Sequence, residues 1–197
     1  MQNFDLTHRV FASMLLKRSR GGKMPWAFMV RIVILGCAGT GKTTLARRLG
    51  ECTGARVICL DDIWRRDWEE KDVPAFRSLI EKAHAGEEWI SDGNFALASF
   101  DIRLPRATLV IWLERSKWSC IWRVITRAFR RGEAHRIDRL PEVLAFIWKF
   151  DRINRPRIER LRVSYAPDVP VCSLAGNRDL ENFLSSFCTH VSRRLSN

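Results

Sequence analysis

Residues 36–43 carry the run GCAGTGKT, which matches the phosphate-binding pattern Gly-x-x-x-x-Gly-Lys-Thr. Glycines at positions 39 and 41 permit backbone angles that point successive N–H groups toward phosphate oxygens. A helix from Lys42 onward would present its positive end to the same anion. Lys42 would reach the terminal phosphates, and the Thr43 hydroxyl would bind Mg²⁺. The predicted nucleotide-binding residues are Gly36, Cys37, Ala38, Gly39, Thr40, Gly41, Lys42, Thr43 and Thr44.

Carboxylates follow two of the short apolar runs. Asp92 ends the run EWISDGN, and a carboxylate at the end of the strand beside the phosphate loop is the usual second anchor of Mg²⁺. Asp61 and Asp62 follow another run. Because the ends of neighbouring parallel strands converge on one cleft, either would hold a Mg²⁺-bound water or accept the proton of an attacking hydroxyl. The alternative is an N-cap for a helix that starts at Ile63.

The residue after Asp92 bears on the class of phosphate-binding protein. Motor ATPases commonly place a water-activating Glu there, whereas this chain has Gly93. The sequence also contains neither an NKxD guanine-reading motif nor an LSGGQ signature. These absences disfavour motor ATPases, GTPases and ABC ATPases, and they favour a kinase, which must not waste its triphosphate on water.

The stretch 116–131 contains two stripes at helical spacing. We expect its apolar stripe to face the core; this stripe comprises Trp118, Ile121, Trp122, Ile125 and Phe129. The other stripe comprises Arg123, Arg127, Arg130 and Arg131. Arginines on a lid neutralise the charge that spreads over a phosphoryl group during transfer. The alternative is a basic helix face exposed to solvent.

The net charge of +12 is concentrated in two segments. Residues 1–29 carry five Lys and Arg against one acid, and residues 115–162 carry fourteen against five. A local basic patch suits a polyphosphate substrate or a nucleic-acid backbone. No apolar run reaches the ~18 residues that a membrane span needs, so we expect no membrane partner.

The six cysteines form neither a CxxC pair nor a Cys/His cluster with metal spacing. Most lie in apolar runs, so we expect buried free thiols and a reducing, cytoplasmic location. Cys37 is the exception because it lies inside the phosphate loop, where it could be sensitive to oxidation.

Short apolar runs predict five strands, over 30–35, 56–60, 89–92, 108–113 and 169–174. Helical patterns lie between them, over 42–52, 73–85, 116–131, 141–161 with a break near Pro156, and 178–195. This alternation predicts an α/β fold with a doubly wound, five-stranded parallel sheet, of the nucleotide-kinase type. Pro170 places the fifth strand at an edge. We expect residues 1–28 to be a disordered extension and residues 29–197 to form one domain, with a short helical lid over about 123–140.

Over 30–184 the chain resembles an adenylate-kinase-like P-loop family labelled topology modulation protein, or FlaR-like. The segments that carry the resemblance are RIVILGCAGTGKTTLARRLG, LDDIW, WISDGNF, VIWLERSKWSCIWRVITRAFRR and LAGNRDLENFL. The resemblance implies a nucleoside-monophosphate-kinase-like fold and ATP-dependent phosphorylation of a small acceptor. DGNF replaces the DGFPR-type run of true adenylate kinases, and the segment after Gly132 is shorter than the usual lid.

The resemblance also implies roles for individual residues. Lys42 with Arg123, Arg127 and Arg131 would stabilise the transferring group. Asp61 and Asn94 would face the acceptor pocket, and Asn177 would lie near the adenine. From its position after the second strand, Asp62 is a further candidate substrate-binding residue.

The leading hypothesis is therefore a kinase that uses ATP and Mg²⁺ to phosphorylate a nucleotide or another small molecule. The second is an ATP-regulated DNA-binding protein that affects DNA topology, favoured by the basic segment and the family label. The third is a slow ATPase without an acceptor, which the missing water-activating Glu disfavours.

Overall fold

The computed structural model describes residues 29–64, 69–130 and 139–195, and the predicted extension 1–28 lies outside them. Five parallel strands form one sheet in the order β2-β3-β1-β4-β5. Their bounds are β1 Arg31–Gly36, β2 Arg56–Cys59, β3 Trp89–Asp92, β4 Leu109–Glu114 and β5 Val171–Ala175. The predicted five-stranded parallel sheet is thus confirmed, with β5 at one edge. Pro170, just before β5, contributes only its carbonyl, which accepts from the Val110 N–H at 2.9 Å.

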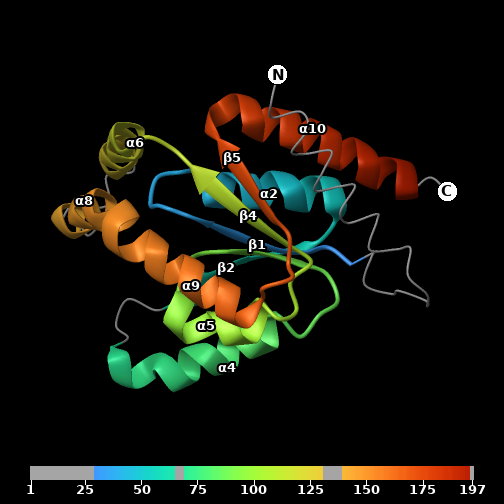
Figure 1. The fold of residues 1–197 in the computed structure, drawn as a ribbon, viewed down its shortest axis with the longest axis horizontal. Helices are drawn as coiled ribbons and strands as arrows, with labels where there is room; N and C mark the ends of the chain where they lie inside the picture. Colours follow the sequence, from blue (N-terminus) through green and yellow to red (C-terminus); the bar gives the residue numbers. More distant parts are fainter. Residues whose placement is uncertain (1–28, 65–68, 131–138, 196–197) are drawn as a thin grey trace.

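Helices cover both faces of the sheet (Figure 1). The helix α2 (Lys42–Thr53) and the long α10 (Gly176–Leu195) lie on one face. The helices α4 (Val73–Ala83), α5 (Ala96–Arg103) and α9 (Arg155–Tyr165) lie on the other, while α6 (Lys117–Arg130) and α8 (Leu140–Lys149) stand at one end. Three short helical segments complete the described fold: α3 (Leu60–Ile63), the 3₁₀ turn Glu70–Asp72 and the π-helix Phe150–Asn154.

Two hydrophobic cores result from the alternation of side chains along β1. Ile32 and Ile34 point to the core beneath α2 and α10, whereas Val33 and Leu35 point to the opposite core. All four are at most 1% exposed. A strand that is buried on both faces must be apolar throughout, which explains the continuous run that predicted it.

The stretch predicted as one helix over 141–161 differs in detail. The helix does not break at Pro156, because this residue lies in the first turn of α9, where a missing N–H is tolerated. The irregularity comes earlier, as the π-helix Phe150–Asn154 between α8 and α9. The helix α5 was not predicted.

The predicted orientation of α6 is wrong for its aromatic residues, although Ile121 packs against the core as expected. Its buried stripe comprises Cys120, Val124 and Ala128, whereas Trp118, Trp122 and Phe129 are 64–71% exposed. The small residues let the helix approach the phosphate loop closely: a Cβ at Gly39 would lie 2.6 Å from the Cys120 carbonyl oxygen. Bulky indole rings would not fit at that distance. The close approach of the two backbones therefore decides which residues of α6 are buried, rather than side-chain hydrophobicity.

The expectation of free thiols is wrong for one pair. Cys52 of α2 and Cys188 of α10 form a disulfide across 136 residues of sequence. Only the packing of α10 on α2 brings them together. Cys37, Cys59, Cys120 and Cys172 are free. Thiol usage therefore no longer supports a reducing compartment. Among the described helices, none has the length and apolarity that a bilayer span requires.

Candidate active site

The phosphate loop connects the end of β1 to the start of α2. Gly41 caps this helix with a left-handed φ of 100° and without a side-chain hydrogen bond. The N–H groups of the first helical turn therefore remain available to an anion. The loop is held from within, because the Thr40 hydroxyl and the Lys42 ammonium donate to the Cys37 carbonyl at 2.8 and 3.0 Å. Lys42 thus lies folded along the loop that it would serve.

A pocket of about 650 Å³ opens over this loop. Its floor comprises Ala38, Gly39, Gly41, Lys42, Thr43 and Thr44. Its walls come from four other elements and comprise Asp61, Gly93, Asn94, Phe95, Arg123, Thr126, Arg127 and Phe146. The pocket therefore joins a phosphate cradle to a carboxylate, two arginines and two aromatic rings.

Thr43 and Asp92 offer oxygen ligands of the kind that Mg²⁺ prefers. The Thr43 hydroxyl donates to Asp92 Oδ2, and Asp92 is only 2% exposed. Asp92 Oδ1 is buried without a hydrogen-bond partner. A hard cation beside these oxygens would satisfy it. The described residues contain no cluster of three His, Cys, Asp or Glu that could hold a metal alone. A bound Mg²⁺ would therefore need phosphate or water oxygens as well.

The turn after Asp92 is pinned to the start of the phosphate loop. Asn94 Nδ2 donates to the Gly36 carbonyl at 3.0 Å, and the Gly36 N–H donates to Asn94 Oδ1 at 3.3 Å. Asn94 thus lines the pocket as expected for an acceptor contact, but both atoms of its amide are engaged by Gly36. Phe95, next in the chain, adopts a φ of 33°, in the left-handed region that is strained for a residue with a side chain.

Sequence reasoning missed Arg103, which is fully buried beneath this turn. Its guanidinium donates to the Gly93 carbonyl at 2.5 Å and to the Asn94 carbonyl. It also donates to the hydroxyls of Ser91 and Ser99 at 3.1 and 3.0 Å. Burial lowers the pKa of Arg103 to about 9, so it remains charged at neutral pH. One buried cation therefore fixes the carbonyls of the whole turn.

His84 extends this buried network. Its Nδ1 lies 2.8 Å from the Ile80 carbonyl, so Nδ1 carries the proton and Nε2 accepts from the Ser91 hydroxyl at 2.9 Å. Burial lowers the pKa of His84 to about 4, which keeps the ring neutral. No sequence motif indicates either residue; only the Ser99–Arg103 spacing of one helical turn hints at a contact.

The two adjacent carboxylates separate. Asp61 lines the pocket, and burial raises its pKa above the usual range, although Lys42 opposes the shift. Both residues are exposed to solvent, but Asp62 is not among the residues that line this pocket. The alternative of an Asp N-cap for a helix from Ile63 is wrong, because α3 begins at Leu60 with Cys59 as its cap.

The predicted arginines separate as well. Arg123 and Arg127 line the pocket. The Arg123 guanidinium lies close to the phosphate loop, because a Cβ built at Gly41 would be 3.5 Å from it. Arg131 lies outside the described residues, together with the rest of the predicted lid over 131–138.

Cys37 was expected to be sensitive to oxidation. Its thiol contacts Cys120, and this hydrogen bond together with burial raises the pKa of Cys37. A protonated thiol is a weak nucleophile, which disfavours ready oxidation.

A second hollow, of about 470 Å³, lies on the other side of the phosphate loop. Its lining includes Cys37, Thr40, Arg115 and Gly176. Arg115, which sequence reasoning missed, donates to the Thr40 carbonyl at 2.8 Å and to Asn177 Oδ1 at 2.5 Å. The structure therefore places Asn177 at the start of α10, connected to the phosphate loop through a single arginine.

No protein-family profile matches the chain, and no curated protein matches its sequence. Solved structures do match. A shikimate kinase from Acinetobacter baumannii in complex with shikimate aligns with a TM-score of 0.53 and 17% identity, over 85% of this chain and 96% of that one. A shikimate kinase from Bacteroides thetaiotaomicron aligns with a TM-score of 0.50 and 17% identity, over 83% and 99%. The chain has the fold of a P-loop kinase.

This P-loop kinase fold accounts for the arrangement of the pocket. In a parallel sheet the ends of β1, β2 and β3 face the same crevice, so Gly36, Asp61 and Asp92 meet although they lie far apart in sequence. At 17% identity the likeness concerns the fold, and the chemistry must be argued from the residues themselves.

Proposed function

We propose that the protein transfers the γ-phosphoryl group of ATP to a small-molecule acceptor, in the manner of an adenylate-kinase-like enzyme. One observation carries this proposal: the phosphate loop and Asp61 line the same pocket of about 650 Å³. A pocket that held only phosphates would not require a carboxylate with a raised pKa in its wall. The nucleotide, or a related hydroxyl compound, would occupy the end near Asp61.

Residues on the floor and one wall of the pocket would stabilise the negative charge of the phosphates and of the transferring phosphoryl group. Lys42 and the first-turn N–H groups of α2 would bind the phosphates, while Arg123 and Arg127 would neutralise charge on the transferring group. Thr43 and Asp92 would hold Mg²⁺, which when bound supplies further neutralisation of the phosphates. Arg131 would join them from the lid, as the family resemblance implies.

Asp61 would act as the general base. As the acceptor oxygen bonds to the γ-phosphorus, the bond from phosphorus to the β,γ-bridging oxygen breaks and ADP leaves. The acceptor's hydroxyl proton passes to the Asp61 carboxylate. A raised pKa makes this carboxylate a stronger base than an ordinary Asp.

The finer assignments remain part of this proposal: the FlaR-like family label, the use of Mg²⁺, a cytoplasmic location and one domain over 29–197. The DNA-binding alternative is weakened, because several cations of the basic segment have partners within the molecule. Arg155 donates to Glu114 at 2.6 Å, and Arg123 and Arg127 line the pocket. Nothing in the described residues offers a basis for an effect on DNA topology.

An acceptor screen tests the proposal. The full chain is incubated with ATP, Mg²⁺ and a panel of nucleoside monophosphates, nucleosides, sugars and hydroxy acids, and ADP formation is measured. We expect at least one acceptor to raise ADP formation well above the acceptor-free rate. If ATP binds but no compound on a broad panel raises that rate, the protein is not a small-molecule kinase.

A further inference from the structure

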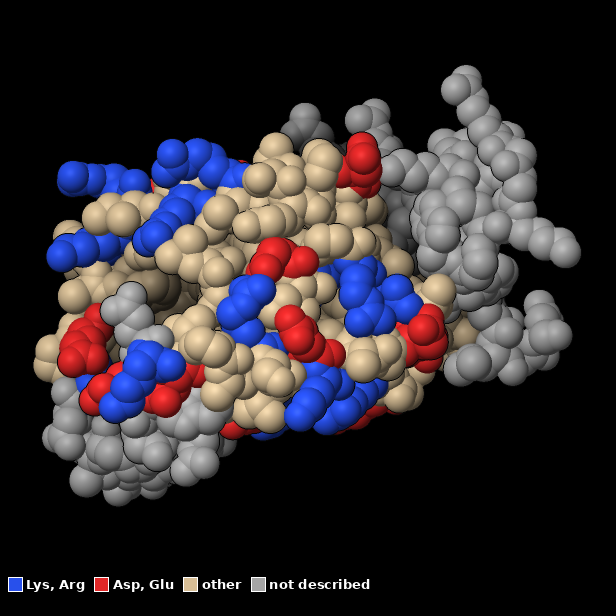
Figure 2. Space-filling model, turned by 90° about the horizontal axis from the view of Figure 1, so that it is seen from below, with Lys and Arg blue, Asp and Glu red and all other residues tan. Residues whose placement is uncertain are grey.

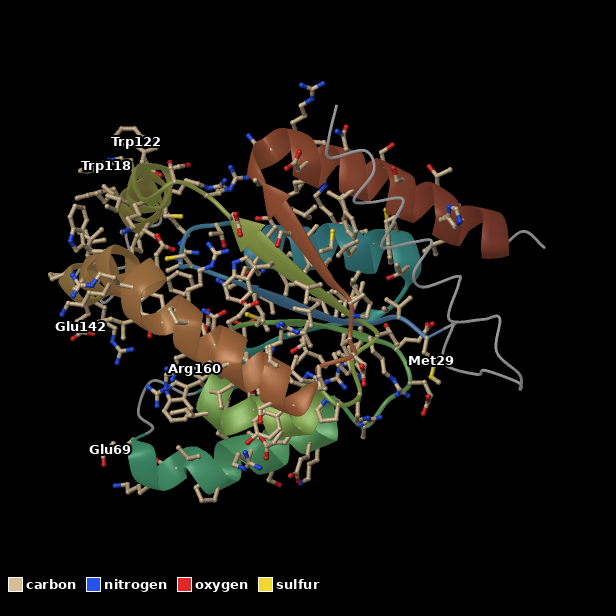
Figure 3. The ribbon with its side chains drawn as sticks, in the orientation of Figure 1. Met29, Glu69, Trp118, Trp122, Glu142 and Arg160 are labelled. Carbon is tan, nitrogen blue, oxygen red and sulfur yellow. A yellow bond between two sulfur atoms is a disulfide. The ribbon has the colours of Figure 1, made fainter. Side chains whose placement is uncertain are left out.

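Four large aromatic side chains lie exposed at the end of the molecule formed by α6 and α8. Trp118, Trp122 and Phe129 of α6 are 71%, 68% and 64% exposed, and Trp148 of α8 is 58% exposed. The Trp118 and Trp148 rings pack edge to face with centroids 6.1 Å apart. We call these four side chains the aromatic ridge. Figure 3 shows Trp118 and Trp122 at the outer side of α6, pointing away from the sheet.

The spacing of these residues makes the ridge a continuous feature. Trp118, Trp122 and Phe129 are four and seven residues apart, so they line one side of the helix. Val124 lies on a second side, against the core, and Arg123 lies on a third, in the pocket. Apart from the contact of Trp118 with Trp148, the aromatic side is thus used neither for packing against the core nor for the phosphate site. A contiguous apolar patch of this kind marks a contact surface.

The charge of α6 restricts the partner. The helix carries Lys117 and three arginines, and it contains no Asp or Glu. Figure 2 shows that Lys and Arg also gather toward the upper left, at the end of the molecule where α8 and α9 lie in Figure 1. Pairing two copies through this end would bring exposed cations such as Lys149 and Arg152 together, which is unfavourable. The complementary partner is anionic and accepts aromatic rings.

We propose that the aromatic ridge docks the protein onto the surface of an anionic lipid bilayer. This peripheral contact differs from the expectation of no membrane partner, which rested on the absence of a membrane-spanning run. A helix with Trp and Phe on one side and cations on the others lies in the plane of the headgroups, with its rings at the acyl boundary. Single-stranded nucleic acid would need open ring faces for stacking. Here the Trp148 ring already has the Lys117 ammonium 5.9 Å from its centre and the Trp118 ring packed against it edge to face, which restricts stacking on Trp148.

Vesicle flotation of the full chain tests this docking independently of any kinase activity. The probes are vesicles of phosphatidylcholine alone and of phosphatidylcholine with phosphatidylglycerol. We expect the protein to float with the anionic vesicles at low salt and to be released as sodium chloride is raised. Trp118→Ser/Trp122→Ser is expected to lower the partition coefficient roughly tenfold or more, because two rings no longer bury apolar surface.

The matched control is Leu97→Ser on α5, where the wild-type side chain is 64% exposed but lies outside the ridge. It should float like the wild type, and circular dichroism should show all three proteins folded. The proposal is overturned if the wild type ignores anionic vesicles, or if the double variant floats equally well. It is also overturned if the ridge instead binds labelled oligo-dT in fluorescence anisotropy, or forms a dimer in sedimentation velocity that the double variant abolishes.

Discussion

The two ends of the pocket are built in different ways. The phosphate end is nearly contiguous in sequence: the loop that starts at Gly36 and the first turn of α2 supply the whole floor. The opposite end is assembled from α3, the turn after β3, α6 and α8, and Arg103, a buried residue that the pocket does not expose, supports that turn. The first end depends on local backbone geometry. The second depends on packing between distant elements, so the two should respond differently to mutation.

Lys42→Met should have the largest effect, because it removes the one ammonium group of the contiguous end. We expect ATP affinity to fall and turnover to drop by about 10³-fold, the scale for loss of a preorganised charge contact. The fold should persist, since the ammonium makes a single hydrogen bond within the described residues, to the Cys37 carbonyl. Calorimetry and ADP release measure the two effects. Arg47→Met, which removes an exposed cation from the same helix, is the control and should change neither.

Arg103→Met probes the assembled end and should act on stability. Removing the guanidinium leaves the Gly93 and Asn94 carbonyls without its hydrogen bonds. We expect the free energy of unfolding to fall by about 3 kcal/mol, as for other broken buried polar networks. Urea denaturation measures it, with the exposed Arg178→Met as control. A decrease in the free energy of unfolding below about 1 kcal/mol would show that the turn keeps its conformation without Arg103.

The neutral His84 beneath this turn should make stability depend on pH. Its pKa is about 4 in the folded protein, below the ordinary value of 6.5. Protonation therefore favours the unfolded chain, and stability present above pH 6.5 is lost as the pH falls toward 4. The full difference corresponds to at most about 3 kcal/mol. Melting temperatures across this range should fall less steeply for His84→Gln; an identical slope would assign the pH dependence to other groups.

Asp62→Ala should have the smallest effect and sharpens the contrast between neighbours. Both residues are exposed, but only Asp61 lines the pocket. We expect turnover and ATP affinity within about twofold of the wild type, as for most surface substitutions. Steady-state kinetics decide the matter. A loss comparable to that of an Asp61 variant would mean that the pocket extends to residues that this arrangement leaves out.

Sequence alone predicted the contiguous features well and the packed ones poorly. The five strands and the phosphate loop follow from local patterns, because buried parallel strands are uniformly apolar and the loop needs glycine at fixed positions. The face of α6 was wrong, since its approach to Gly39 selects the small Cys120 over the larger indoles. Arg103 and the Cys52–Cys188 disulfide could not be predicted, because each depends on partners that only the fold brings near.

The most direct test of the central claim, that both ends of the pocket serve one phosphoryl transfer, is Asp61→Asn. ATP affinity by calorimetry and acceptor-dependent ADP formation are measured on the same preparation. We predict ATP affinity within about threefold of the wild type and turnover reduced by about 10²–10⁴-fold, the contribution of a positioned general base. The wild-type acid limb should also lie above the range of an ordinary Asp, because burial raises the pKa of Asp61. Undiminished turnover in Asp61→Asn would contradict the claim.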